Sequence, residues 1–337
     1  MGSRPRRRAV KVARKAKRPA RSAKRRAARA KPAQLKTPGA LVSTEWLAAQ
    51  LLEPRGGAAE PRGGAVEPRA GAAGPRVRVL DGTWHMPQLQ RDPRREFEEA
   101  HIPGAAFFDI DGIADRASSL PHMLPGAAQF ARQVGALGIS NADLVVVSDA
   151  PGVVSAARVW WPFRAFGHDR VAVLDGGLRK WRAEGRPVES GAATPAPRRF
   201  AARRRLALVR DVGQMRRNMG SRREQTLDAR SRGRFAGTEP EPRAGLRGGH
   251  IPGSLNLPYD MLYRPDATLL PPDGLRQAFA AAGVDLGKPV ATTCGSGITA
   301  SVLALGLHLI GHKKVAVYDG SWTEWAGRSD TPVEPPI

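Results

Sequence analysis

Short apolar runs alternate with longer segments of helical character along most of the chain. Residues 76–81 (Arg-Val-Arg-Val-Leu-Asp) and 289–293 (Pro-Val-Ala-Thr-Thr) have the length and the β-branched content of buried strands. Residues 44–52 and 300–305 are rich in Ala and Leu and are predicted to be helical. Such an alternation is typical of a parallel sheet with helices on both faces. The pattern therefore predicts an α/β fold.

Several of these elements occur twice in the sequence. The His-Ile-Pro-Gly motif at His101 recurs at His250, the run 167–177 recurs as 311–321, and Trp181 recurs as Trp325. The spacing is 149 residues for the first match and 144 for the others. Because whole supersecondary units are repeated, the sequence predicts two tandem domains, each a parallel sheet flanked by helices.

The repeat also predicts the domain boundaries. The first domain covers 39–190 and the second covers 225–337, with a linker rich in Pro, Ala and Arg over 191–224. Residues 53–76 contain three copies of a seven-residue unit of the form Glu-Pro-Arg-Gly-Gly-Ala-Ala, which has no hydrophobic seam. Since Pro and Gly disfavour a coiled coil, we expect this stretch to be a flexible insertion in the first domain.

The net charge of +23 comes mainly from one segment. Residues 1–38 contain 16 Lys and Arg and no acidic residue, so the remaining chain carries only +7 (23 − 16). A block of like charge with few apolar residues cannot form a core, and we expect a disordered basic tail. The tail could be a solvated appendage, a non-specific contact for nucleic acid or anionic lipid, or a transit peptide.

Composition limits the location and the class of protein. The chain contains one cysteine, which excludes an intramolecular disulfide framework and cysteine-rich zinc sites. No apolar run is long enough for a transmembrane helix, and no secretory signal is evident. The histidines show no convincing metal-ligand spacing, and no cofactor is expected. We therefore expect no membrane association and a cytoplasmic protein, or a mitochondrial one if the tail is a transit peptide.

The single cysteine, Cys294, lies between the predicted strand and the predicted helix of the second domain, in the loop Cys-Gly-Ser-Gly-Ile-Thr. Free backbone N–H groups at a helix start favour a thiolate, so Cys294 is a candidate nucleophile. The alternative is a buried structural cysteine. A phosphatase loop would need an arginine six residues later, where this chain has Ala300. An ungapped overlay places Ala150 opposite Cys294, with Asp149 beside it, so the first domain lacks a nucleophile.

The combination of duplicated His-Ile-Pro-Gly motifs, a cysteine loop in the second copy alone and Asp-Gly-Gly/Ser…Trp tails resembles the rhodanese superfamily of sulfurtransferases. Within it, the loop 294–299 is similar to that of 3-mercaptopyruvate sulfurtransferases, whereas thiosulfate sulfurtransferases usually carry Arg and Lys at the positions of Gly295 and Ser296. The resemblance covers residues 41–52 and 77–334. Ile298, where Val is usual, and the insertion at 53–76 depart from the pattern. Further matching motifs are 107–111, 122–126, 159–161 and 233–243.

The resemblance implies two tandem rhodanese-like domains and a specific chemistry. Cys294 would attack the sulfur of 3-mercaptopyruvate and become a persulfide, pyruvate would leave, and the sulfur would pass to cyanide or to a thiol acceptor such as thioredoxin or a small thiol. The loop would hold the anionic sulfur through backbone N–H groups. The loop residues that follow the cysteine and would contribute to this site are Gly295, Ser296, Gly297, Ile298 and Thr299.

The resemblance also implies roles for five side chains. Arg234 and Arg243 would grip the carboxylate and keto oxygen of the substrate, which suits the bidentate donors of a guanidinium group. Ser296, His122 and Asp111 would form a relay that delivers a proton to the leaving enolate. In the alternative, Ser296 donates only within its loop and His122 is structural. Two other functions stay open: a thiosulfate:cyanide sulfurtransferase, and a nucleic-acid-associated protein with a vestigial rhodanese part.

Overall fold

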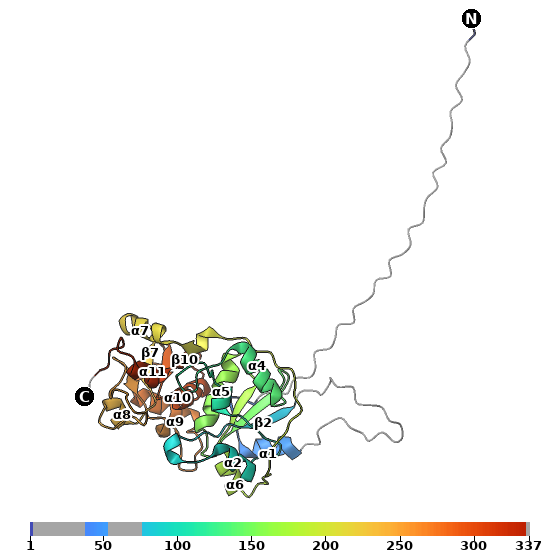
Figure 1. Ribbon diagram of the computed structural model, residues 1–337, viewed down its shortest axis with the longest axis horizontal. Coiled ribbons are helices and arrows are strands. Elements are labelled where there is room, and N and C mark those ends of the chain that lie inside the picture. Colours follow the sequence, from blue (N-terminus) through green and yellow to red (C-terminus); the bar gives the residue numbers. More distant parts are fainter. Residues whose placement is uncertain (3–37, 53–75, 335–337) are drawn as a thin grey trace. The chain divides into compact units, whose positions relative to one another are not determined.

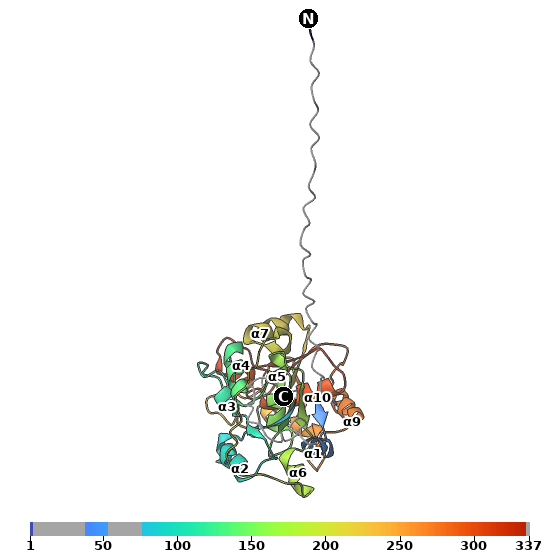
Figure 2. The same ribbon diagram turned by 90° about the vertical axis from the view of Figure 1, so that its right-hand side faces the viewer.

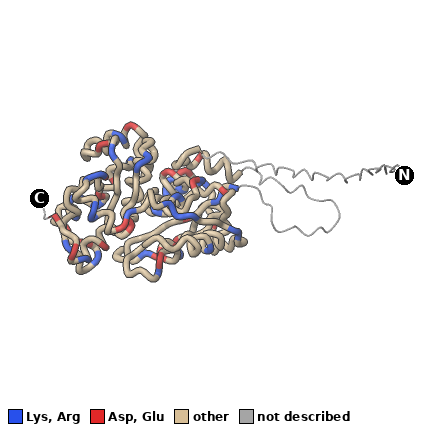
Figure 3. The backbone as a smooth tube through the Cα atoms, turned by 90° about the horizontal axis from the view of Figure 1, so that it is seen from above, with Lys and Arg blue, Asp and Glu red and all other residues tan. Residues whose placement is uncertain are grey.

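The computed structural model describes residues 1–2, 38–52 and 76–334 (Figures 1 and 2). The predicted basic tail and the repeat insertion lie almost entirely outside the described residues. Within the described residues, both halves of the repeat belong to one compact unit. Figure 3 shows that Lys and Arg are scattered over both halves and are interspersed with Asp and Glu.

Each half contains a five-stranded, wholly parallel sheet, as the alternation of strands and helices predicts. The first sheet has the order β1-β5-β4-β2-β3 and the second the corresponding order β6-β10-β9-β7-β8. The first sheet consists of β1 (Leu41–Val42), β2 (Val77–Asp81), β3 (Ala106–Phe107), β4 (Leu144–Ser148) and β5 (Val171–Leu174). The second consists of β6 (Val209–Arg210), β7 (Gln225–Asp228), β8 (Leu255–Asn256), β9 (Val290–Thr293) and β10 (Val315–Tyr318).

Apart from η1 and η2, the helices occur in the same sequence order in the two halves. The first half contains α1 (Thr44–Leu52), η1 (Pro87–Leu89), α2 (Pro93–Glu99), α3 (Ile110–Ile113), α4 (Ala127–Ala136), α5 (Val154–Ala165) and α6 (Gly177–Ala183). The second contains η2 (Leu206–Leu208), α7 (Val212–Ser221), α8 (Arg232–Ala236), η3 (Tyr259–Leu262), α9 (Pro272–Ala281), α10 (Ile298–Leu309) and α11 (Ser321–Gly327).

Helices cover both faces of each sheet. Leu47 of α1, Phe97 of α2 and Trp181 of α6 pack on one face of the first sheet, and these helices lie together in both ribbon views. On the other face, α5 packs against α10 between the two sheets (Figure 1). The buried residues of α5 and α10 belong to one continuous hydrophobic cluster, so the two domains share a core rather than a solvated interface.

The second sheet begins earlier than the predicted domain boundary. Strand β6 and helix α7 belong to it, although both lie in the predicted linker 191–224. Helix α7 begins at a capping box, in which Asp211 and Gln214 bond to each other's backbone N–H groups, and it buries Met215. The helix was not predicted from the sequence, because its few apolar residues are surrounded by many arginines.

Strand register places Asp149, and not Ala150, opposite Cys294. Ser148 of β4 pairs with Asp81, and Thr293 of β9 pairs with the equivalent Asp228. The next residue in each case is therefore Asp149 or Cys294. The overlay from sequence was wrong by one residue, because five residues separate β4 from α5 and only four separate β9 from α10.

His101 and His250 have equivalent structural roles, as expected from their place in the repeat. His101 stacks on Phe97 at 4.1 Å between ring centroids, and His250 stacks on Phe235 at 3.8 Å. Each ring also bonds through Nδ1 to the carbonyl of the same phenylalanine, at 2.7 and 2.9 Å. Both imidazoles are buried, and Nε2 of His250 also lies 3.1 Å from the carboxylate of Glu334. These contacts fit a structural role for both rings.

Candidate active site

The site is built around the loop between β9 and α10. Cys294 is 2% exposed, and the backbone N–H of Gly297 donates to its Sγ at 3.1 Å. Gly297 has φ +83°, a left-handed conformation that turns the chain into the helix and aims its N–H at the sulfur. An amide donor of this kind stabilises negative charge on sulfur, as expected for a nucleophile at a helix start.

The start of α11 supports the other side of this loop. The Trp322 N–H donates to the carbonyl of Cys294 at 2.8 Å. Thr323 donates to the carbonyl of Gly295 through both its N–H, at 2.9 Å, and its hydroxyl, at 2.7 Å. Because these two loop carbonyls are bound by α11, the start of this helix fixes the loop that carries the thiol.

The equivalent loop of the first domain shows what such a nest binds. The buried carboxylate of Asp149 accepts hydrogen bonds from the N–H groups of Gly152, Ser155 and Ala156 at 2.7–2.8 Å. Burial raises the pKa of Asp149, and these N–H donors oppose that effect. The first domain therefore fills its own loop with an acidic side chain, whereas the second domain places a thiol there.

Two arginines face the Cys294 loop from the segment around α8. A Cβ on Gly295 would lie 3.0 Å from Nη2 of Arg234 and 3.9 Å from Nη1 of Arg243, so both guanidinium groups approach the loop where glycine leaves room. Burial lowers the pKa of Arg243, while the nearby Cys294 raises it. The two arginines predicted from sequence thus lie together beside the thiol.

The two arginines differ in how far neighbouring carboxylates neutralise their charge. Nη2 of Arg234 pairs with Glu241 at 2.6 Å, and the Glu241 side chain is 3% exposed. Glu241 also accepts from the buried Arg230, at 2.7 Å. Among the described residues, no acidic side chain forms an ion pair with Arg243. Arg243 therefore presents the less compensated positive charge to the loop.

His122 and Asp111 form the other half of the predicted relay. Nδ1 of His122 lies 2.7 Å from a carboxylate oxygen of Asp111, whose other oxygen accepts from the indole N–H of Trp84 at 3.0 Å. The ring of His122 is buried, which lowers its pKa, while Asp111 opposes this effect. The imidazole beside it lowers the pKa of Asp111. The pair is therefore a neutral imidazole oriented by a carboxylate.

Ser296 is buried in the loop, as the relay requires. Within the described part of the chain, no hydrogen bond joins its hydroxyl to His122. The Nε2 atom of His122 is buried and has no hydrogen-bond partner in the described residues. The structure therefore brings Asp111 and His122 into contact and leaves Nε2 of the imidazole without a partner among the described residues. Asp109 is separate from this pair and caps α3, where its carboxylate accepts from the Gly112 N–H at 2.8 Å.

Other residues of the site were missed in the sequence. Trp84 and Glu241 orient Asp111 and Arg234, respectively. Arg158 and Asp319 form a buried ion pair behind the loop. The signal for Glu241 was its place between the two arginines, and the signal for Asp319 was the repeated Asp-Gly pair. Arg158 precedes the Trp-Trp motif, but nothing local indicates its contact 161 residues away.

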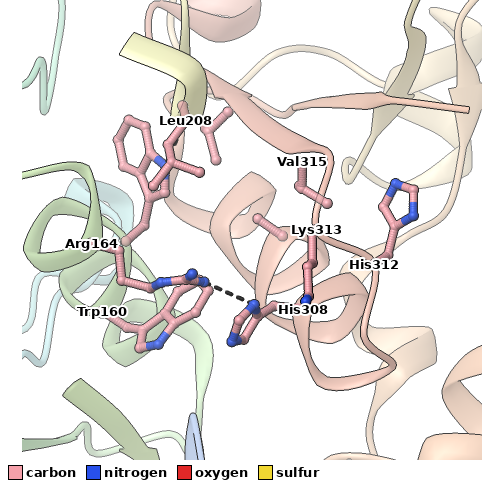
Figure 4. Close-up of a pocket in the computed structure, with 10 residues that line it drawn as sticks. Trp160, Arg164, Leu208, His308, His312, Lys313 and Val315 are labelled. Atoms are coloured by element: carbon pink, nitrogen blue, oxygen red, sulfur yellow. Dashed lines mark hydrogen bonds between the residues drawn. The ribbon is translucent and has the colours of Figure 1, made fainter. Parts of the chain in front are cut away.

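A separate cavity opens between the domains at the C-terminal ends of α5 and α10 (Figure 4). Its volume is about 220 Å³, and it is lined by Trp160, Arg164 and His308, among others. Arg164 bonds to His308 Nδ1 at 2.9 Å, and burial lowers the pKa of His308 to about 4. The cavity contains none of the predicted site residues. In the described residues, no group of three His, Cys, Asp or Glu side chains could hold a metal ion.

Comparison with known proteins identifies this arrangement. The rhodanese-like domain family matches residues 90–184 and 211–328. The chain belongs to the rhodanese family. Both halves of the repeat are therefore rhodanese-like domains, as the sequence motifs indicated. In the described residues, no helix is long and apolar enough to cross a membrane.

Individual relatives indicate which enzymes of the family the chain is similar to. Human 3-mercaptopyruvate sulfurtransferase is 47% identical over 292 residues, covering 86% of this chain and 93% of the relative. A protein of Arabidopsis thaliana named thiosulfate/3-mercaptopyruvate sulfurtransferase 1, mitochondrial, is 44% identical over 321 residues, covering 89% and 79%. The crystal structure of SseA from Escherichia coli, described as a 3-mercaptopyruvate sulfotransferase, matches with a TM-score of 0.72, 33% identity and coverage of 84% and 99%. These relatives confirm the expected enzyme class.

Proposed function

We propose that this rhodanese-family enzyme transfers sulfur from 3-mercaptopyruvate to a thiol or to cyanide through a persulfide on Cys294, and that it releases pyruvate. One observation carries the proposal: the thiol with an N–H donor at 3.1 Å and two guanidinium groups converge on the same short loop. A nucleophilic sulfur and a carboxylate clamp are the two features that an anionic sulfur donor requires.

In the first step, the Cys294 thiolate attacks the thiol sulfur of the substrate. A sulfur–sulfur bond forms, the carbon–sulfur bond breaks, and its electron pair remains on carbon as the enolate of pyruvate. The substrate's thiol proton is transferred to that carbon, so no oxidant or reductant is consumed. Ser296, backed by His122 and Asp111, carries this proton in our proposal, since neutral His122 has a free Nε2.

The arginines bind the ends of the substrate that do not react. A planar α-keto acid offers adjacent carboxylate and carbonyl oxygens, which match the parallel N–H donors of guanidinium groups. Arg243, which lacks a compensating carboxylate in the described residues, takes the carboxylate in our proposal. Arg234, partly neutralised by Glu241 at 2.6 Å, takes the uncharged keto oxygen.

In the second step, an acceptor removes the outer sulfur and restores the Cys294 thiolate. Cyanide would leave as thiocyanate, and a thiol such as thioredoxin or a small thiol would become a persulfide. Backbone N–H groups of residues 295–299 stabilise the persulfide anion between the steps, as those of the first domain stabilise the Asp149 carboxylate.

Thiosulfate is the second candidate donor, because two similar proteins of Arabidopsis thaliana carry both donors in their names. Thiosulfate is a dianion and favours extra positive charge, whereas Gly295 and Ser296 add none to the loop. We propose a cytoplasmic location, or a mitochondrial one if the tail at 1–38 is a transit peptide. Non-specific contact of this tail with nucleic acid is a separate proposal.

The test compares 3-mercaptopyruvate and thiosulfate as donors under the same conditions. Steady-state rates with cyanide and with a thiol acceptor are measured together with the intact mass after donor alone. We expect a higher kcat/KM for 3-mercaptopyruvate and a mass gain of one sulfur atom that maps to Cys294. A protein that gains no sulfur from either donor would overturn the proposal.

A further inference from the structure

Arg158 reaches from the nucleophile-free domain into the back of the Cys294 loop. It lies on α5, and its side chain and that of Asp319 are each 3% exposed. Its Nη2 pairs with Asp319 at 2.9 Å and also donates to the carbonyl of His122. Its Nη1 lies 3.5 Å from the carbonyl of Gly297. One guanidinium group therefore touches both the cysteine loop and the backbone of the relay histidine.

The surrounding residues fix this guanidinium group. Its central carbon lies 4.7 Å from the ring centroid of Trp161, one turn along the same helix. A Cβ at position 297 would approach Nη1 to 2.6 Å, so only glycine leaves room for the arginine. The second oxygen of Asp319 accepts the Leu124 N–H at 2.8 Å, and thereby holds the segment that follows His122.

His122 itself needs such support. Its φ is +61°, a left-handed conformation that is costly for a residue with a side chain. Arg158 binds the carbonyl of this residue, and Asp319 binds the chain two residues later. The position of the imidazole therefore depends on one contact within the first domain, from Arg158, and on one contact from the second domain, from Asp319.

The duplicated half provides an internal control. Ala267 is the equivalent of His122, with φ +65°, and the Leu269 N–H donates to Asp175 at 2.9 Å as that of Leu124 does to Asp319. The helix position equivalent to Arg158, four residues after the start of α10, is Val302. The same interdomain contact thus forms around the Asp149 loop without an arginine, so Arg158 is specific to the side with the thiol.

We propose that Arg158 is a positioning residue that, with Asp319, sets the imidazole of His122 against the Cys294 loop. The inference rests on the proposed persulfide chemistry and adds a requirement from the first domain. The domain without a nucleophile then contributes both the histidine of the proposed relay and the residue that positions it.

The charge of Arg158 also acts on His122. The charged groups that face this imidazole are Asp111, Arg158 and Arg243, with Asp319 behind Arg158. Burial lowers the pKa of His122 first, Asp111 raises it, and the two arginines lower it further. Removing the positive charge of Arg158 therefore raises the pKa of His122, and more of the imidazole is protonated at mildly acidic pH.

The experiment uses two variants of the full chain and one control. Arg158→Met combined with Asp319→Asn removes the pair together, because a single change would leave a buried charge without its partner. Arg158→Lys keeps the charge but lacks the branched guanidinium group that reaches the carbonyls of His122 and Gly297. Arg164→Met is the matched control, since it removes another arginine from α5 at the same interface, beside His308 instead of the loop.

We expect the double variant to lose roughly 10- to 100-fold in kcat, with KM for 3-mercaptopyruvate little changed. The acidic limb of its pH–kcat/KM profile should move to higher pH. Arg158→Lys should lower kcat but keep the acidic limb of the parent. The control should resemble the parent in both. A folded double variant with the kcat and pH profile of the parent would overturn the inference, as would equal losses in variant and control without a pH shift.

A measurement without substrate separates this inference from the proposed function. Hydrogen exchange at residues 122–124 and 294–297 should accelerate in both Arg158 variants and stay unchanged in Arg164→Met. If the parent forms no persulfide but exchange accelerates as described, the proposed function fails and the positioning role stands. If exchange in these segments is unchanged, the positioning role fails even in an active sulfurtransferase. Should the double variant not fold, Arg158→Lys decides by the same measurements.

Discussion

Asp149 and Cys294 occupy the same position in the two sheets. Each follows the strand at the centre of its sheet, and the carbonyl of each accepts an N–H from the helix after the last strand, Leu178 at 2.9 Å and Trp322 at 2.8 Å. A carboxylate in one copy and a thiol in the other thus use the same type of loop. The loop of the first copy therefore holds a structural carboxylate, and the loop of the second copy holds the thiol that we propose to react.

The carboxylate of Asp149 should matter for stability and not for catalysis. Asp149→Asn replaces an acceptor oxygen by an NH₂ group that faces N–H donors, at the cost of about 1–3 kcal/mol of unfolding free energy. We expect a lower denaturant midpoint, with kcat/KM for 3-mercaptopyruvate close to that of the parent once both are folded. A large loss of kcat in the folded variant would show that the first loop also takes part in the reaction.

Replacing the thiol should abolish sulfur transfer. Cys294→Ser keeps the size and the Gly297 contact of the side chain, but an oxygen cannot carry the sulfane sulfur. We expect an unchanged circular dichroism spectrum, no turnover with either donor and no gain of sulfur in the intact mass. Turnover in this variant, which contains no cysteine, would contradict the assignment.

The two arginines should contribute unequally. Arg243→Ala removes the cation without a carboxylate partner, and we expect KM for 3-mercaptopyruvate to rise roughly 10- to 100-fold, as for loss of a charged hydrogen bond. Arg234→Ala should have a smaller effect, because Glu241 already neutralises part of its charge. Arg232→Ala, an exposed position of the same helix α8, is the control. Equal effects of all three would place the clamp elsewhere.

The sequence predicted those features that depend on local pattern. Helix α1 has the predicted bounds, and β2 and β9 lie within one residue of the predicted strands. The strands β1 and β6 were missed because two residues are too few to show a pattern. The sequence overlay aligned Ala150 instead of Asp149 with Cys294, because the one-residue difference in loop length can be recognised only from the strand register. Arg158 was missed because its partner lies 161 residues away, and only packing of α5 on α10 brings the two together.

His168 should make stability depend on pH. Burial among the rings of Phe163 and Phe200 lowers its pKa from 6.5 to about 4. The unfolded chain then binds a proton between pH 6.5 and 4 that the folded chain does not, so this contribution to stability is present above pH 6.5 and is lost as pH falls. At pH 5 the loss is about 2 kcal/mol.

The measurement is the difference between the parent and His168→Gln, because other groups titrate in the same range. Burial raises the pKa of Asp81 to about 6, and its contribution changes in the opposite direction, being lost as pH rises through 6. We expect the variant to lose less unfolding free energy than the parent between pH 7 and pH 5. Parallel pH dependences of the two proteins would show that His168 is not buried in neutral form.

Loop charge should set donor preference. In Gly295→Arg with Ser296→Lys, two positive charges join the loop, and they favour a dianionic donor over a monoanionic one. The structure adds a steric effect, because a Cβ at position 295 would lie 3.0 Å from Nη2 of Arg234 and would require this group to shift slightly. The lost Ser296 hydroxyl also slows pyruvate release if the relay operates. We therefore expect kcat/KM for 3-mercaptopyruvate to fall and that for thiosulfate to rise.

Gly295→Ala with Ser296 retained is the matched control, because it displaces Arg234 without adding charge. The quantity to compare is the ratio of kcat/KM for the two donors in the parent, the control and the charged variant. If the ratio changes as much in the control as in the charged variant, the change in donor preference comes from the shift of Arg234 and not from the added charge. A ratio that stays constant in all three, with each protein folded and able to form a persulfide, would mean that residues 295 and 296 do not decide the donor. The subfamily would then have to be assigned from other residues, with the Arg234–Glu241 pair as the next candidate, since Glu241 sets how much positive charge reaches the loop.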